Sequence, residues 1–275
     1  MIERVIHEYA LKDSRVTVVK NETNVGLANS LNRGLNMAKG EYIARMDADD
    51  ISCSDRLRQQ LEYMLNNRLD FVGSYITRID EAGDDMNISC RLPRHDFFIR
   101  KTLRFYGCIM HPTWLVRNQV FSDLNGYRNV PSTEDYDLLL RARKKEVKFG
   151  VVDKALVKYR HNYSGITMSS NARQRVVALY LQKNFRSIDD LNIDDYLQTD
   201  DAKKKMEIAE KHAAISEKAW EYRLAKNKVM HFRSLIQMLF GSRYGFCAAV
   251  NLAIFKLFVV ADCIVHRRTP PLISY

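Results

Sequence analysis

Hydrophobic positions in the first half of the chain alternate between two periods. Short runs rich in β-branched and aromatic residues, at 15–20, 41–46 and 70–79, predict strands. Between these runs, apolar residues recur at helical spacing over 24–39 and again from Leu57 to Leu65. Strands that alternate with helices are typical of an α/β sheet covered by helices, so the pattern predicts a mostly parallel sheet.

The pattern changes in the second half of the chain, where strand signals become rare. Residues 171–185 and 201–235 are rich in Ala, Lys, Glu and Arg at helical spacing. We therefore expect an α/β domain over 1–165, followed by an α-helical extension over 166–240.

The last segment, 241–275, is apolar and then basic. Residues 245–265 are apolar except for Asn251, Lys256 and Asp262, and the basic run 266–268 follows directly. A helix that spans a bilayer carries few such interruptions. Two interpretations stay open: a buried helix or hairpin of the extension, or an anchor that lies in the membrane interface. With an anchor, the protein would be peripheral on the inner face of the membrane.

Composition narrows the class of protein. The 275 residues are 46% hydrophobic, which is enough for a buried core, and carry a net charge of +10. This charge favours a polyanionic neighbour, but no aromatic-interleaved basic motif supports nucleic acid as a partner. The five cysteines are scattered without a C-x-x-C pair, and MIERVIHEYA (1–10) lacks the apolar run of a signal peptide. We expect a cytoplasmic protein.

An acidic cluster, Asp47-Ala48-Asp49-Asp50, follows the apolar run 41–46. In an extended chain, residues i and i+2 point the same way, so Asp47 and Asp49 can face one ligand. Two carboxylates suit a hard cation such as Mg²⁺ or Mn²⁺ that keeps its other positions for water and substrate phosphates. The alternative is a solvated acidic turn in which Asp50 or Ser54 caps the next helix.

Several ordered motifs resemble those of the family 2 glycosyltransferases, the inverting enzymes of GT-A fold that build bacterial polysaccharides. The segment NETNVGLANSLNRGLNMAKGEYIARMDADD (21–50) is similar to one continuous run of that family. Further on, HPTWLVR (111–117), NGYR (125–128) and TEDYDLLLR (133–141) resemble its acceptor-side block. The resemblance covers residues 21–161 and implies a GT-A-like α/β fold with flanking helices.

The resemblance also implies an activity and a set of site residues. The activity is transfer of a sugar from a nucleotide-sugar donor to a hydroxyl of a glycan or lipid-linked acceptor, with inversion and with a divalent cation, Mn²⁺ or Mg²⁺. The matching positions give Asp47 and Asp49 as metal ligands on the donor side, Asp135 as the base, and Glu134 as a residue that orients the base or contacts the acceptor. The other matching donor-side positions are Asn24, Gly26, Asn32 and Arg45.

Two of these motifs also have a plain structural interpretation. Ser132-Thr133-Glu134-Asp135 satisfies the capping-box pattern, in which Asp135 would lie three residues into a helix and bond its N-terminus. Arg160 and His161 resemble a late basic segment of the family that reaches the diphosphate, but a pair of surface residues fits equally well.

The start of the chain departs from the family pattern. The family usually begins with two strands and an Asp-Asp-Gly-Ser type turn that holds the nucleoside, and residues 1–11 resemble the helix after that turn. We therefore expect an N-terminally incomplete domain. A second hypothesis follows: a catalytically impaired remnant, or an assembly partner that needs a separate N-terminal half. A basic protein that binds polyanions is the third, and net charge alone supports it.

Overall fold

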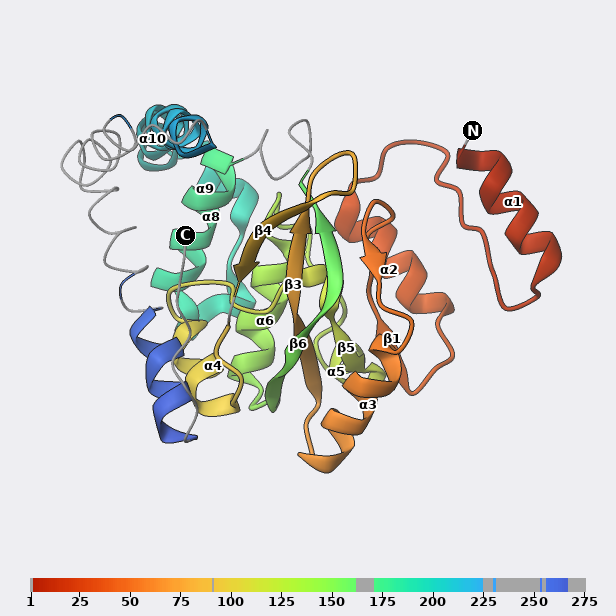
Figure 1. Ribbon diagram of the computed structural model, residues 1–275. Coiled ribbons are helices and arrows are strands. Elements are labelled where there is room, and N and C mark those ends of the chain that lie inside the picture. The colour runs from red at the N-terminus through yellow and green to blue at the C-terminus, as the bar shows by residue number, and fades with distance from the viewer. Residues whose placement is uncertain are drawn as a thin grey trace.

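One six-stranded sheet lies at the centre of the molecule, with helices packed against it (Figure 1). The computed structural model describes residues 2–90, 92–161, 171–224, 230, 253 and 256–266. Along the sheet the strands run in the order β1-β5-β3-β6-β2, and β4 pairs with β3. Their bounds are β1 Tyr42–Ala44, β2 Ile51–Ser52, β3 Phe71–Ile79, β4 Asp85–Cys90, β5 Leu115–Arg117 and β6 Phe149–Arg160.

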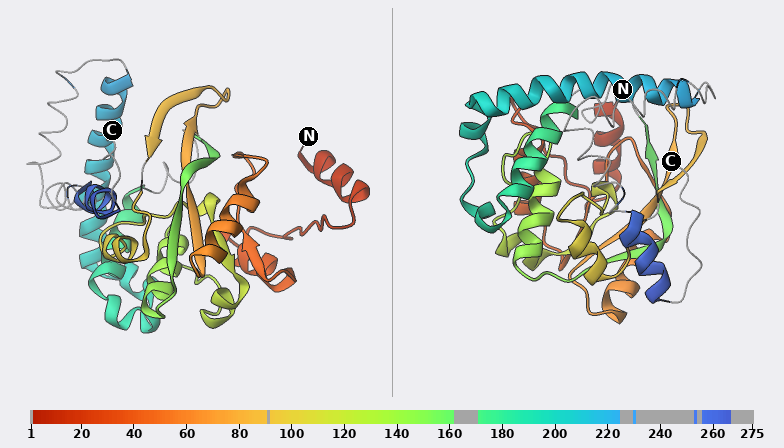
Figure 2. Two further views of the ribbon diagram at one scale, coloured as in Figure 1. Left: turned by 60° about the horizontal axis from the view of Figure 1, so that its bottom comes forward. Right: turned by 90° about the vertical axis from the view of Figure 1, so that its left-hand side faces the viewer.

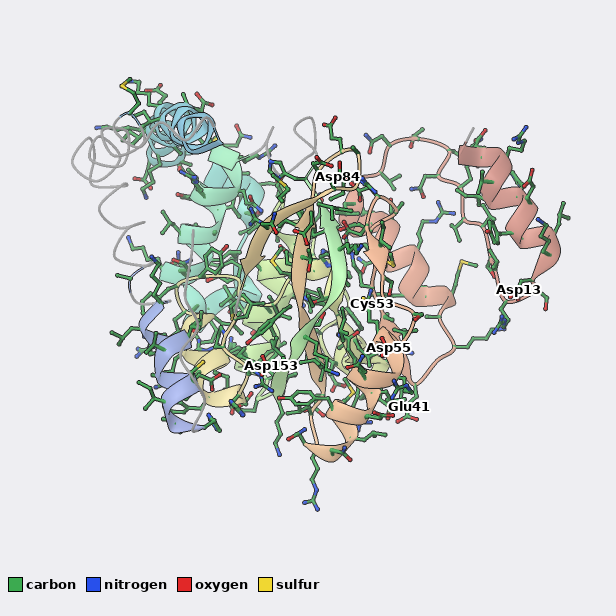
Figure 3. The ribbon with its side chains drawn as sticks, in the orientation of Figure 1. Asp13, Glu41, Cys53, Asp55, Asp84 and Asp153 are labelled. Atoms are coloured by element: carbon green, nitrogen blue, oxygen red, sulfur yellow. The ribbon has the colours of Figure 1, made fainter. Side chains whose placement is uncertain are left out.

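The strand directions differ from the prediction. Only β3 and β6, the two longest strands, run parallel, from Phe71 opposite Phe149 to Ile79 opposite Arg160. The other four pairings that the structure describes are antiparallel. The expected mostly parallel sheet is therefore wrong. The alternation of strands and helices along the sequence does not tell which strand pairs with which neighbour in the sheet. In addition, β3 and β4 are joined directly by a turn that includes Asp84, and strands joined in this way run antiparallel (Figure 3).

The strand expected over 15–20 is also absent from the described sheet. This segment is extended, and its Val16, Val18 and Val19 side chains are 39–40% exposed. A strand needs a hydrogen-bonded neighbour, and no described strand pairs with these residues. Figure 2 shows helix α1 (Ile2–Lys12) lying away from the sheet at the end of this segment.

The structure has helices in the two segments of the α/β part where apolar spacing predicted them. Helix α2 fills most of the segment expected from 24 to 39, and α3 covers the expected segment from Leu57 to Leu65, although Leu57 and Leu65 themselves are exposed. The helical elements are α2 Leu27–Met37, α3 Arg56–Asn66, α4 Asp96–Thr102, the 3₁₀ helix η1 His111–Thr113, α5 Asn118–Asp123 and α6 Glu134–Lys144.

Most residues of helix α6 are buried. Leu138, Leu139 and Leu140 are each at most 1% exposed, because the helix has apolar neighbours on several sides. The same core contains Phe71 and Trp114 from the sheet side and Leu181 from the C-terminal helices. This burial fixes where the N-terminus of α6 lies.

The C-terminal extension is helical, as expected. Helices α8 and α10 pack together over Val176, Ala202 and Ala209, and the rings of Tyr180 and Tyr196 stack at 3.7 Å. The expected domain boundary near residue 165 lies outside the described residues. The elements are α8 Asn171–Lys183, the 3₁₀ segment η2 Phe185–Asp190, α9 Ile193–Gln198 and α10 Asp200–Leu224.

Most of the segment 241–275 lies outside the described residues, and the expected anchor stays a prediction. Residues 256–265 form a helix that lies beside α4 (Figure 1) and buries Val259 and Asp262, each 2% exposed. Among the described residues, no helix is both long enough and apolar enough to cross a membrane.

Candidate active site

The acidic cluster forms a turn after β1. The Asp50 nitrogen lies 3.4 Å from the Asp47 carbonyl oxygen. The segment is therefore a turn, whereas the prediction that Asp47 and Asp49 point the same way assumed an extended chain. The carboxylate of Asp47 is about one-third exposed and pairs with the Arg45 guanidinium, which is 9% exposed. Asp49 is exposed. The turn thus presents one free carboxylate and one that an internal cation neutralises.

Arg160, at the end of β6, holds this turn in place. Its backbone N–H donates to Asp50 Oδ1 at 2.9 Å, and its Nε donates to the Asp49 carbonyl at 2.9 Å. Its Nη1 donates to the carbonyls of Asp80 and Glu81, at 3.0 and 2.8 Å. The guanidinium therefore binds the backbone of two loops. Neither sequence interpretation of Arg160 included this role.

Asp50 is a site residue that the sequence interpretation missed. It is 8% exposed, and burial together with the charges of Asp47 and Asp49 raises its pKa to about 6. Its Oδ2 is buried and has no hydrogen-bond partner among the described residues. The alternative interpretation, in which Asp50 or Ser54 caps the next helix, is wrong, because Asp55 is the N-cap residue of α3. Three acidic residues within four positions were the available signal.

Two buried polar residues of α3 fasten the chain around Arg45. Arg56 Nη2 donates to the Arg45 carbonyl at 2.6 Å, and its Nε donates to Gln60 Oε1 at 2.9 Å. Gln60 Nε2 in turn donates to the Thr113 carbonyl at 2.6 Å. These bonds join the strand end that precedes the acidic turn to the HPTW motif. Ordinary amphipathic periodicity did not reveal them, because Arg56 and Gln60 face inward with their polar ends.

Asn32 of α2 binds the NGYR motif. Its Nδ2 donates to the Tyr127 carbonyl and its Oδ1 accepts the Tyr127 N–H, both at 2.8 Å. Gly126 has a φ of +67°, and a Cβ at this position would lie 2.4 Å from Asn32 Oδ1. Glycine is needed here for both reasons. The side-chain amide of Asn32 therefore positions the loop.

Tyr127 and His111 form a buried pair beneath this loop. His111 Nε2 lies 2.9 Å from the Tyr127 hydroxyl, and the two residues are 8% and 4% exposed. Burial lowers the pKa of His111 well below its ordinary value and raises that of Tyr127. Both side chains are therefore neutral at physiological pH.

A buried ion network joins NGYR to α6. Arg128 and Arg141 both bind the carboxylate of Asp137, which is fully buried; Arg141 Nε lies 2.7 Å from Asp137 Oδ2. Arg141 also donates to the carbonyls of Leu124 and Gly126, at 2.7 and 2.9 Å. These three charged residues fix the loop against the helix. An Asp and an Arg four positions apart in a run of leucines were the sequence signal.

Glu134 and Asp135 begin α6, and their carboxylates do not form the capping box. Thr133 is the N-cap residue and makes no side-chain bond to the helix; its Oγ1 donates to the Pro131 carbonyl at 3.1 Å. Asp135 Oδ1 accepts the adjacent Tyr136 N–H at 2.6 Å. The capping interpretation of Ser132 and Asp135 is therefore wrong, because neither side chain makes the reciprocal capping bonds.

Burial raises the proton affinity of both carboxyl groups. It raises the pKa of Glu134 to about 7, with the charge of Asp135 as the second cause, and it also raises the pKa of Asp135. The positive charge of Arg45 lowers both pKa values and the negative charge of Asp47 raises them. The charges of Arg45 and Asp47 therefore affect the ionisation of both carboxyl groups at the start of α6.

The remaining donor-side residues lie at the start of α2. Asn24 Oδ1 accepts the Gly26 N–H at 3.1 Å, and both residues are exposed. Gly26 is the N-cap of α2, with φ 81° and ψ 165°, a backbone conformation that is accessible essentially to glycine alone. The structure gives Asn24 and Gly26 a local contact with each other, and their role toward a donor stays a prediction.

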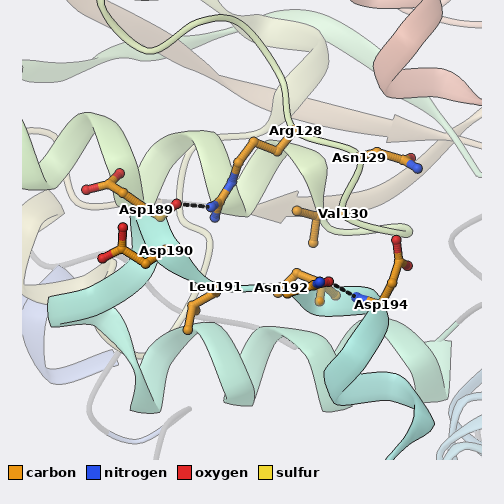
Figure 4. Close-up of a pocket in the computed structure, with 9 residues that line it drawn as sticks. Arg128, Asn129, Val130, Asp189, Asp190, Leu191, Asn192 and Asp194 are labelled. Atoms are coloured by element: carbon orange, nitrogen blue, oxygen red, sulfur yellow. Dashed lines mark hydrogen bonds between the residues drawn. The ribbon is translucent and has the colours of Figure 1, made fainter.

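Two cavities border these elements. One of about 540 Å³ lies between α2 and β1, and Arg45 and Tyr127 form part of its wall. Another, of about 280 Å³, lies between Arg128 of the NGYR motif and residues 189–194 of the extension (Figure 4). The larger cavity adjoins the acidic turn through Arg45 and Met46.

Replacing Glu134 by Gln is expected to stabilise the protein at alkaline pH. A carboxyl whose folded pKa lies above its unfolded value favours folding at low pH, and that contribution is lost as pH rises through the window from about 4.5 to about 7. The uncharged amide escapes this loss. At pH 8 the free energy of unfolding should therefore rise by up to about 3 kcal/mol, with little change at pH 4.

Urea unfolding at the two pH values measures this difference. Glu22→Gln, at an exposed position, is the matched control and should change neither value. Equal stability of the parent and the Glu134→Gln variant at pH 8 would contradict the buried ionisation.

Comparisons with known proteins agree with this geometry. Residues 2–124 match the model described as Glycosyl transferase family 2. The O-antigen biosynthesis glycosyltransferase WbnJ of Escherichia coli is 35% identical over 166 residues, which cover 59% of this chain and 64% of WbnJ. An uncharacterized glycosyltransferase of Methanocaldococcus jannaschii is 32% identical over 185 residues, which cover 66% of this chain and 63% of that protein. The chain thus spans less than two thirds of the length of these relatives.

Two solved structures share the fold. The mannosyltransferase PcManGT of Pyrobaculum calidifontis, in complex with GDP-Man and Mn²⁺, has a TM-score of 0.51 at 16% identity and covers 91% of this chain and 74% of its own. Residues 1–349 of S. aureus TarS, in complex with UDP-GlcNAc, have a TM-score of 0.51 at 14% identity and cover 98% of this chain and 80% of their own. The expected GT-A-like α/β fold is confirmed. Residues 2–124 of the chain are thus similar to glycosyl transferase family 2.

Proposed function

We propose that this chain transfers a sugar from a nucleotide-sugar donor to an acceptor hydroxyl, with inversion and with a divalent cation. The observation that carries the proposal is the electrostatic link between two acidic groups. The negative charge of Asp47 in the acidic turn raises the pKa of Glu134 and of Asp135 at the start of α6, and the positive charge of Arg45 lowers both pKa values. Such an arrangement supplies a leaving-group side and a base side in one space.

The acidic turn suits a hard cation. Asp47 and Asp49 would hold Mn²⁺ or Mg²⁺ through their carboxylates, and the buried Oδ2 of Asp50, which has no hydrogen-bond partner among the described residues, adds acceptor capacity beside them. When bound, the cation supplies positive charge that stabilises the departing nucleoside diphosphate. Arg45 neutralises Asp47 in the structure described here, and its guanidinium can also bind a donor phosphate.

Asp135 is the proposed base. The acceptor oxygen bonds to the anomeric carbon while the bond from that carbon to the diphosphate oxygen breaks, and the electron pair leaves with the nucleoside diphosphate. The hydroxyl proton passes to the Asp135 carboxylate. One in-line displacement inverts the anomeric centre. The helix N-terminus lowers basicity, but burial outweighs it and raises the pKa of Asp135.

Glu134 would contact the acceptor. Its raised pKa, about 7, leaves a substantial protonated fraction at neutral pH, so its carboxyl can donate a hydrogen bond as well as accept one. On the donor side, Asn24, Gly26 and Arg45 would contact the nucleotide-sugar directly. Asn32 would act by holding the Tyr127 backbone.

Relatives and neighbours suggest substrate classes. PcManGT and TarS were solved with GDP-Man and UDP-GlcNAc, so these are the first donors to test. WbnJ acts in O-antigen biosynthesis by name, which supports a glycan or lipid-linked acceptor. The net charge of +10 suits a cytoplasmic protein that works at the anionic inner face of a membrane.

The test is the stereochemistry and metal dependence of transfer. The chain is incubated with GDP-Man or UDP-GlcNAc, Mn²⁺ and a panel of saccharide acceptors, and proton NMR follows the anomeric signal of the product. From an α-linked donor, a β-linked product is expected, and EDTA should stop its formation. An α-linked product would overturn inversion, and transfer that persists in EDTA would overturn the role of the cation.

A further inference from the structure

Three residues that can bind a metal, His95, Asp262 and His266, converge far from the acidic turn. His95 precedes α4 and forms a β-bridge with Gly150, at the start of β6, whereas Arg160 holds the acidic turn at the other end of that strand. Asp262 and His266 come from the C-terminal helix of residues 256–265 and the residue after it. Ten residues of β-strand span roughly 33 Å, so this cluster is separate from the candidate active site.

The geometry of the cluster is compact. A ring nitrogen of each histidine and a carboxylate oxygen of Asp262 lie within 4.8 Å of one another. His95 Nδ1 is 2.6 Å from Asp262 Oδ1, and His266 Nδ1 is 3.4 Å from the same oxygen and 2.9 Å from the Asp262 carbonyl. The two imidazole rings stack at 3.3 Å, with 7° between their planes.

The Asp262 carboxylate is held in place for this contact. It is 3% exposed, and its Oδ2 accepts the Arg94 N–H at 2.8 Å, which leaves Oδ1 toward the two rings. The Arg94 guanidinium binds Asp153 at 2.5 Å and so does not neutralise Asp262 (Figure 3 labels Asp153). A buried carboxylate needs a positive partner, and here only the histidines face its Oδ1 among the contacts described.

A divalent ion between the two rings supplies positive charge to the carboxylate without a proton on the ring nitrogens that bind the ion. If both imidazoles were protonated, two positive rings would stack at 3.3 Å and repel each other. A single divalent ion replaces both protons and pairs with the carboxylate at the same time. The ordinary donor set for such an ion is imidazole nitrogen with carboxylate oxygen, which suits Zn²⁺.

We propose that His95, Asp262 and His266 bind one transition-metal ion, with Zn²⁺ the best match to the donors. The two histidine side chains are 32% and 34% exposed, which gives the ion an entry path and leaves a fourth position for water. Binding turns the rings out of their stack so that each directs a nitrogen lone pair at the ion. The bound ion would fasten residues 256–266 to the start of α4, 167 positions away in the sequence.

The experiment measures Zn²⁺ binding to the full chain in a background that lacks the acidic-turn carboxylates. In the Asp47→Asn, Asp49→Asn double variant, equilibrium dialysis should find one tightly bound Zn²⁺ per chain. Adding His95→Gln or His266→Gln should weaken that binding by at least about 100-fold, since removing even an outer-shell partner of a metal ligand costs 10–100-fold. Zn²⁺ should raise the thermal midpoint of the background protein and of neither histidine variant.

Two controls make the result decisive. His7→Gln, at an exposed position of α1, should bind Zn²⁺ like the background protein. Co²⁺ in place of Zn²⁺ should give visible ligand-field bands without thiolate charge-transfer bands; thiolate bands would assign the ion to a cysteine such as the adjacent Cys263 and overturn the proposal. No stoichiometric binding, or binding that survives both histidine substitutions in proteins with native circular dichroism, would also overturn it.

Discussion

Replacing Asp135 by Asn is expected to lower turnover by about 10²–10⁴, equivalent to about 3–5 kcal/mol of activation free energy. The amide keeps the shape of the side chain and its oxygen can still accept the Tyr136 N–H, so the start of α6 is preserved. What it loses is the capacity to take the acceptor proton. The measurement is kcat at saturating donor, with the donor KM expected to stay nearly constant because the donor side is untouched.

Asp123→Asn is the matched control for this variant. Asp123 is exposed at the end of α5, where its carboxylate accepts a bond from Gln119 at 2.7 Å. This substitution should leave kcat unchanged. Full activity of the Asp135→Asn variant would remove Asp135 from the role of base. A fall in thermal midpoint large enough to explain the lost activity would assign the residue a structural role instead.

Replacing Asp49 by Asn is expected to abolish metal-dependent binding of the donor. The exposed carboxylate of Asp49 is free to take a cation, whereas that of Asp47 already pairs with Arg45. Asp49 is therefore the cleaner position to test, because its substitution releases no buried partner. Loss of one carboxylate ligand should weaken donor binding in Mn²⁺ by at least about 100-fold, or roughly 3 kcal/mol.

Calorimetric titration of GDP-Man or UDP-GlcNAc, with Mn²⁺ and with EDTA, measures this effect. In EDTA the parent and the variant should bind equally weakly. Asp84→Asn lies in the exposed turn after β3 (Figure 3) and serves as the control. If Asp49→Asn binds the donor and Mn²⁺ like the parent, the assignment of the metal site to the acidic turn is incorrect.

Local periodicity predicted the elements that depend on local contacts. Helices α2 and α3 and strand β3 lie where apolar spacing placed them, because each buries one face or one run of side chains. The acidic turn and the Glu134–Asp135 pair were also identified from residue types and motif order. Their roles in catalysis stay predictions, and the structure adds that the charge of Asp47 raises the pKa of both Glu134 and Asp135.

The features that the sequence could not reveal all join distant segments. Asn32 meets Tyr127 across 95 positions, and Arg160 meets Asp49 across 111. The direction of each strand also depends on distant segments, because it is set by the neighbour with which the strand pairs. Residues 15–20 have the composition of a strand, but no described strand pairs with them. Propensity describes how well a segment fits a surface, but the surface itself is built by the rest of the chain.

The buried network of Arg128, Asp137 and Arg141 has a consequence for mutational screens. Removing Asp137 leaves the guanidinium groups of Arg128 and Arg141 without their shared carboxylate, which typically costs about 3–5 kcal/mol and can lower the amount of folded protein in a cell severalfold; removing either arginine takes away one of the two partners of the buried Asp137 carboxylate. Substitutions at these three positions will therefore score as inactive although none of the three needs to touch a sugar. A screen that records protein abundance beside product formation would separate such positions from Glu134 and Asp135, whose variants should be abundant and inactive.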